Sequence, residues 1–142
     1  NRVNEFPPSK KKISSKKIEV SAGIIIKNKK VYIQQRMKNG LMGGLWEFPG
    51  GKREQGESPE NCLKREIEEE LRVNVVSLSK VMTIKHTYTQ FRVTLTVFNC
   101  KLQKKQIRPV GCEQWKWVTL SNLKKYPFPA ANVKIVKYLT EK

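Results

Sequence analysis

The segment from Ser58 to Leu71 has the strongest helix signature in the chain. Ser58 is a favourable N-cap, and Pro59 takes the first helical position, where its missing N–H costs nothing. Leu63, Ile67 and Leu71 then recur every four residues and form one apolar stripe. The pattern predicts an amphipathic helix from Pro59 to Leu71 that packs one face against a core.

The other face of this predicted helix is acidic. Glu66, Glu69 and Glu70 stand at positions i, i+3 and i+4, so their carboxylates emerge together, one turn apart. Like charges at this spacing repel one another. Mg²⁺ or Mn²⁺ would remove the repulsion, because these ions take oxygen ligands and leave coordination positions for water and phosphate. The spacing therefore predicts a divalent metal site, and a solvated Glu-rich helix face remains the alternative.

Charge is distributed unevenly along the chain. The 142 residues include 29 basic and 12 acidic side chains, a net charge of +17, yet eight of the acidic residues fall between positions 47 and 70. A basic surface attracts polyanions such as nucleotides or nucleic acid. The segment from residue 47 to residue 70 is therefore interpreted as an acidic region, suited to hard cations, within an otherwise basic protein.

The rest of the pattern is typical of one α+β domain on a mixed sheet. Residues 1–17 are expected to form a flexible basic linker or tail, and residues 18–142 the folded domain. Trp46, Trp115 and Trp117 are interpreted as packing residues rather than base-stacking platforms. Alternating apolar residues predict strands, a loop is expected over 103–111, and helical spacing predicts a last helix over 130–139. The expected strands cover residues 18–27, 31–35, 45–48, 92–98 and 115–120, with strand-like sequence from 73 to 84.

Composition excludes several classes of protein. The apolar runs are too short to span a membrane, so no membrane partner is expected. Three cysteines without a CxxC pair indicate reduced thiols, which favours a cytoplasmic protein. We expect a monomer. Because the chain starts at Asn1 rather than Met, we keep the alternative that it is a fragment of a longer protein.

The segment from Gly51 to Val73 resembles the Nudix box, G-x5-E-x7-R-E-U-x-E-E-x-G-U, where U is a bulky aliphatic residue. Every fixed position matches except the last glycine, which is Arg72 here. The resemblance implies a Nudix-type α/β/α sandwich whose box forms a loop–helix–loop. It also implies hydrolysis, dependent on Mg²⁺ or Mn²⁺, of a nucleoside diphosphate linked to another group.

The same resemblance assigns roles to individual residues. Glu66 would be a metal ligand or the base that activates water, and Glu69 would belong to the same catalytic set. Arg65 would orient Glu57 and the loop before the helix. The implied metal ligands are Gly50, Glu66, Glu69, Glu70 and, from outside the box, Glu113.

A narrower resemblance indicates the substrate. Arg36 and the segments 46–52 and 127–132 resemble MutT-type enzymes, which hydrolyse 8-oxo-dGTP to the monophosphate and pyrophosphate. The resemblance implies that Asn132 reads the oxidised guanine and that Arg36 and Lys52 lie near the nucleotide. Without it, Asn132 would be interpreted as a cap of the last helix.

A second resemblance gives an alternative function. Residues 40–49 and 86–91 are similar to the C-terminal domain of the MutY A/G-specific adenine DNA glycosylases, which senses 8-oxoguanine in duplex DNA. This implies that Tyr88 and Thr89 contact the lesion and that the chain is a fragment of such a glycosylase. The first hypothesis remains a nucleotide hydrolase, with the glycosylase domain as the alternative.

Overall fold

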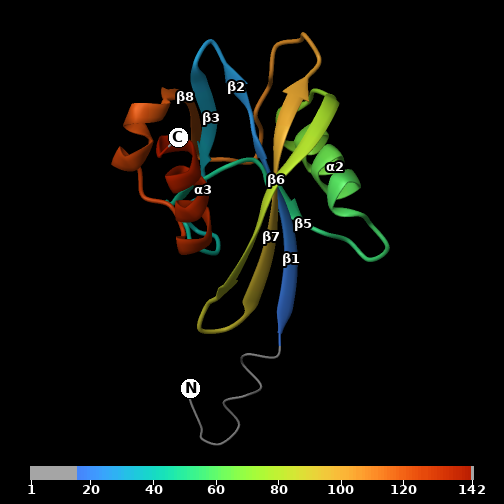
Figure 1. The fold of residues 1–142 in the computed structure, drawn as a ribbon, viewed down its shortest axis with the longest axis vertical. Coiled ribbons are helices and arrows are strands. Elements are labelled where there is room, and N and C mark those ends of the chain that lie inside the picture. Colours follow the sequence, from blue (N-terminus) through green and yellow to red (C-terminus); the bar gives the residue numbers. More distant parts are fainter. Residues whose placement is uncertain (1–15, 142) are drawn as a thin grey trace, which may run out of the picture.

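The computed structural model describes residues 16–141 as two β-sheets with helices on both sides (Figure 1). No helix in this range is long and apolar enough to cross a membrane. The strands are β1 (Lys17–Ile24), β2 (Ile26–Lys27), β3 (Lys30–Gln35), β4 (Trp46–Glu47), β5 (Gly50–Lys52), β6 (Val75–Thr87), β7 (Arg92–Leu102) and β8 (Gln114–Thr119). The helices are α2 (Pro59–Leu71), the short 3-10 helix η2 (Leu120–Lys125) and α3 (Ala130–Thr140).

The first sheet has the order β5-β1-β7-β6. Strands β1 and β7 run parallel, whereas β1–β5 and β6–β7 are antiparallel pairs. In the second sheet β3 pairs antiparallel with β2, β4 and β8. The first sheet is mixed, so the predicted α+β class with a mixed sheet is confirmed.

The two helices cover opposite sides of the sheets, and Figure 1 shows α2 and α3 apart on either flank. Under α2, the stripe Leu63, Ile67 and Leu71 packs with Phe98 of β7 and Tyr32 of β3. A second apolar cluster lies beneath α3 and η2. Its largest contributors from the helices are Leu123, Ile135, Val136 and Leu139. The layers therefore form an α/β/α sandwich with one apolar cluster on each side.

Helix α2 has the bounds that the sequence predicts. The Ser58 hydroxyl accepts a hydrogen bond from the Asn61 amide at 3.1 Å, which satisfies one free N–H of the first turn. At the other end Arg72 adopts a left-handed conformation with φ 61°, and its amide donates to the Glu68 carbonyl at 3.0 Å. Arg72 thus takes the conformation that suits the glycine of the box.

Three local expectations need correction. The strand predicted over residues 18–27 is divided into β1 and β2, and β5 was not predicted at all. β5 is short and rich in glycine because Gly50 lies against β1, where a Cβ would come within 2.0 Å of the Ser21 carbonyl oxygen. Lys17, assigned to the tail, is the first residue of β1 and pairs with Arg92. Lys16 is also described and accepts a hydrogen bond from the Arg92 amide, whereas residues 1–15 of the predicted tail lie outside the described residues.

We expect Arg72→Gly to stabilise the protein. A left-handed backbone costs an L-residue with a side chain roughly 1 kcal/mol, which glycine avoids. The melting temperature should rise by roughly 3 °C in a calorimetric scan. Arg72→Ala is the matched control, because it removes the same exposed charge and keeps the strained backbone. Equal melting temperatures for the Gly and Ala variants would contradict the role given to this conformation.

Candidate active site

Arg65, in the middle of α2, connects the acidic residues of the box. Its Nε and Nη2 atoms donate to the two carboxylate oxygens of Glu57 at 2.7 and 3.0 Å, a bidentate pair. Its Nη1 atom lies 2.9 Å from Glu66 Oε2 and 3.4 Å from Glu69 Oε1, and Nη2 donates to the Lys52 carbonyl. The hydrogen bonds from Arg65 lower the pKa of Glu57 to about 2. One guanidinium therefore holds the loop before α2 against the acidic face of the helix.

Glu70 has a different environment, because its carboxylate is enclosed. Its Oε1 atom accepts from Gln34 Nε2 at 3.1 Å and lies 3.3 Å from the Gly50 amide nitrogen. Burial, a hydrogen bond shared with Glu66 and the negative charge of Glu47 together raise the pKa of Glu70 to about 9. The negative charge of the Glu70 carboxylate therefore needs a proton or a cation to balance it.

Gln34 is a site residue that the sequence analysis missed. Its buried amide also donates to Glu47 Oε2 at 3.0 Å, and its Oε1 accepts from the Tyr32 hydroxyl at 2.9 Å. A single glutamine in a strand carries no chemical signature by itself. The available signal was that Gln34 shares the inward face of β3 with Tyr32, since alternate residues of a strand point to the same side.

The backbone of β5 lies directly against Glu66. A Cβ atom at Gly51 would come within 2.3 Å of the Glu66 carboxyl carbon, so this position has no room for a side chain. Strand β5 therefore borders the acidic face of α2 directly, with only backbone atoms facing Glu66.

The carboxylate arrangement fits a hard divalent cation. Glu66 and Glu70 meet inside the site, and two carboxylates in contact need a shared proton or a cation. Glu69, whose side chain is 55% exposed, is directed to Arg65 instead. Glu113 is exposed and bonds only through its backbone, to the Gln35 carbonyl. Within residues 16–141 no three or more His, Cys, Asp or Glu side chains are already grouped as metal ligands. The structure therefore offers the Glu66–Glu70 carboxylate pair, with the carboxylate of Glu69 beside it.

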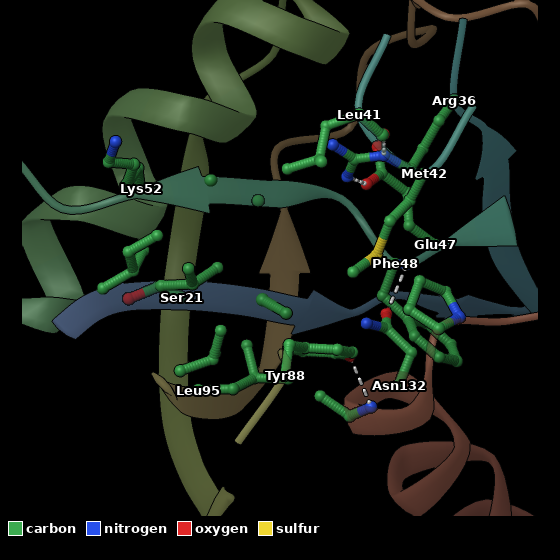
Figure 2. Close-up of a pocket in the computed structure, with 18 of the residues that line it drawn as sticks. Ser21, Arg36, Leu41, Met42, Glu47, Phe48, Lys52, Tyr88, Leu95 and Asn132 are labelled. Carbon is green, nitrogen blue, oxygen red and sulfur yellow. Dashed lines mark hydrogen bonds and ion pairs between the residues drawn. The ribbon is translucent and has the colours of Figure 1, made fainter. Parts of the chain in front are cut away.

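A cavity of about 280 Å³ lies on the opposite side of β5 (Figure 2). Its lining is largely apolar, and its polar side chains are Ser21, Arg36, Glu47, Lys52, Tyr88 and Asn132. Thr89 does not line it, because this residue is exposed in the turn between β6 and β7. The structure thus brings most of the predicted nucleotide contacts to one cavity and leaves Thr89 outside it.

Asn132 and Tyr88 face this cavity from two elements. Asn132 Oδ1 accepts from the Phe48 amide at 3.4 Å, and its amide nitrogen is turned toward the pocket (Figure 2). The N-cap of α3 is Pro129, without a side-chain hydrogen bond, so the capping interpretation of Asn132 is wrong. The Tyr88 hydroxyl accepts from the Ala131 amide at 3.0 Å and so holds the first turn of α3 in place.

Arg36 is engaged within the protein. Its Nη1 atom pairs with Glu47, and its Nε donates to the Leu41 carbonyl at 2.8 Å, as the dashed lines in Figure 2 mark. The guanidinium therefore fastens the loop after β3 to β4 at the rim of the cavity. Lys52, by contrast, is exposed and makes no ion pair within the part of the chain described.

Comparison with known proteins gives consistent similarities. The profile of the NUDIX domain family matches residues 21–138. An 8-oxo-dGTP diphosphatase of Proteus vulgaris is 40% identical over 87 residues, 61% of this chain and 78% of that protein. One from Buchnera aphidicola is 35% identical over 114 residues, 80% of this chain and 86% of that protein. A structure from a study of MutT from Aliivibrio salmonicida and Vibrio cholerae is 32% identical, covers 89% of this chain and 98% of its own, and gives a TM-score of 0.76.

These similarities bear on the two hypotheses formed from the sequence. The relatives are diphosphatases, and they agree with the first hypothesis. They give no support to the alternative, the C-terminal domain of an adenine glycosylase.

We expect Gln34→Leu to destabilise the fold by about 2 kcal/mol, because it leaves the buried Tyr32 hydroxyl and two carboxylates without their partner. Urea unfolding of the purified protein measures this difference. Gln114→Leu is the control, since it makes the same change at an exposed position of β8 and should cost less than about 0.5 kcal/mol. Equal losses of stability in the two variants would show that the hydrogen bonds of Gln34 to Tyr32, Glu47 and Glu70 do not stabilise the fold.

Proposed function

The chain belongs to the Nudix family, and we propose that it is a MutT-type pyrophosphohydrolase acting on 8-oxo-dGTP or a related oxidised purine nucleotide. One observation carries the proposal: the Glu66–Glu70 pair and the cavity walled by Asn132 lie on the two sides of the same short strand, β5. The names of the similar diphosphatases support this substrate class.

The cavity suits a purine. Its walls include Phe48, Tyr88 and Leu95, which offer apolar and aromatic surface to a flat base. Because the Phe48 amide occupies the oxygen of the Asn132 amide, the NH₂ group is what remains for a ligand. We propose that this donor binds an acceptor oxygen of the oxidised guanine.

The phosphates would extend from the cavity along β5 toward the helix. Lys52, exposed at the end of this strand, would contact them, while Arg36 supports the rim through Glu47 and Leu41. We propose that Glu66, Glu70 and the Gly50 carbonyl hold a divalent cation, Mg²⁺ or Mn²⁺, with Glu69 beside them. Glu113, which is exposed in the loop before β8, would be a further ligand from outside the box.

Hydrolysis then needs a proton acceptor and a fixed phosphate chain. A bound divalent cation supplies Lewis acidity at the phosphoanhydride and lowers the pKa of an attacking water. We propose that Glu66 accepts the proton of that water, and that Arg65, which donates hydrogen bonds to Glu66 and Glu57, keeps both in position. The water oxygen forms the new bond to phosphorus, and the anhydride bond between the α- and β-phosphates breaks to give the monophosphate and pyrophosphate.

Glu70→Gln tests the proposed metal set. The change keeps the side-chain size and removes the charge of the enclosed carboxylate, so we expect kcat for pyrophosphate release from 8-oxo-dGTP with Mg²⁺ to fall by about 100-fold or more. Glu68→Gln makes the same change on the exposed side of α2 and should leave the rate unchanged. Full turnover by the Glu70 variant would exclude the metal role of this residue.

Asn132→Ala tests base recognition separately. Loss of one hydrogen bond to the oxidised base should raise KM for 8-oxo-dGTP by about 10-fold, with kcat/KM for dGTP changed much less. Steady-state kinetics on the two nucleotides with the same enzyme measures the selectivity. An equal loss with both nucleotides would mean that Asn132 shapes the cavity without reading the lesion.

A further inference from the structure

A second hollow, of about 880 Å³, lies away from the nucleotide cavity, and no residue lines both. It is bounded by β2, by the end of β7 with the loop that follows it, and by β8. In Figure 1 the hairpin of β2 and β3 and the loop after β7 lie at the end of the molecule opposite the first described residues. The proposed hydrolysis uses none of these residues.

The charge of this hollow has one sign. Four lysines line it and no acidic residue does. All four are exposed, and none forms an ion pair within residues 16–141. The lysines are Lys27, Lys101, Lys104 and Lys105. Uncompensated positive charge around a concave surface attracts a polyanion.

Two tryptophans stand among these lysines. Trp115 is 42% exposed and Trp117 is half-buried, so part of each ring is open to solvent. Both rings rest on Tyr32, with ring centroids 6.0 and 5.7 Å from it. Ile26, 49% exposed, adds apolar surface nearby. Large exposed aromatic rings supported from below offer a stacking surface.

The wall of the hollow that the loop after β7 forms is held in place. The Gln103 amide donates to the Asn74 carbonyl at 3.0 Å, and the Gln103 side chain accepts from the Asn74 amide at 2.8 Å. Further along, the Arg108 amide donates to the Leu71 carbonyl at the end of α2. The loop is thus fastened to the helix, so a ligand would meet a preformed surface and lose less entropy on binding.

We propose that this hollow binds single-stranded nucleic acid, with a base stacked on Trp115 and backbone phosphates on the four lysines. Aromatic rings among lysines are the elements by which proteins hold single strands without reading their sequence. The tryptophan rings would find no exposed base face in a duplex, where the bases are stacked on each other. An acidic peptide would match the lysines but would supply no flat ring for Trp115.

Fluorescence anisotropy with a labelled 12-nucleotide oligo-dA tests the proposal on the full chain. Excess dGMP, which has no phosphoanhydride bond to hydrolyse, is included to fill the nucleotide cavity. We expect binding that persists with dGMP and weakens as salt rises. With four phosphate contacts, the logarithm of affinity should fall by about 3 for each tenfold rise in salt. RNA of the same sequence distinguishes the two sources of single strand, and binding of either supports the site.

Paired variants separate this surface from the general charge of the protein. Trp115→Leu should weaken binding by about 10-fold. The double change Lys104→Ala with Lys105→Ala should weaken it and lower the salt slope by about 1.4. The matched control is Lys124→Ala with Lys125→Ala, which removes the same charge from η2, outside the hollow. Pyrophosphate release should be unchanged in all of them.

Three results would overturn the proposal. The first is equal weakening by the two lysine pairs, which would mean that binding follows net charge alone. The second is unchanged affinity in Trp115→Leu, which would remove the stacked base. The third is displacement of the oligonucleotide by poly-glutamate or by duplex DNA as readily as by an unlabelled single strand.

Discussion

The enclosed carboxylate of Glu70 joins helix α2 to both β-sheets at one point. It belongs to α2, accepts a hydrogen bond from Gln34 of the second sheet and lies against the amide of Gly50 in the first. A carboxylate in this position is costly unless it is balanced, since burial favours the neutral form. The site and the packing of the sheets are therefore not independent, because both need the same contacts around this group.

Arg65 limits the electrostatic cost of the remaining acidic side chains. Its guanidinium lies among Glu57, Glu66 and Glu69, so the acidic face of α2 is partly neutralised from within the box. Lysine could not replace it, because a single ammonium group has no planar fork for the bidentate contact with Glu57. The Glu66–Glu70 contact keeps an excess of negative charge, and this is where we propose that a cation binds.

The sequence predicted features that depend on neighbouring residues and missed those that depend on distant ones. The bounds of α2 follow from a local cap, a proline and an apolar stripe, so they were predicted correctly. β5 was missed because its pairing is dictated by the approach of Gly50 to Ser21, which is 29 positions away. The contact of Gln34 with Glu70 was not predicted, because Glu70 lies 36 residues further along the chain. The contact of the Tyr88 hydroxyl with α3 was missed for the same reason, since Ala131 lies 43 residues further along.

Tyr32 links the two surfaces of this protein, which differ in charge and chemistry. Burial raises the pKa of its phenol, so the hydroxyl keeps its proton and donates to Gln34 on the side of the acidic site. The ring of the same residue supports Trp115 and Trp117 on the side of the basic hollow. Because Tyr32 is fully buried, its ring cannot shift without disturbing the hydrogen bond to Gln34. The rigidity that holds the carboxylates in place therefore also holds the aromatic surface.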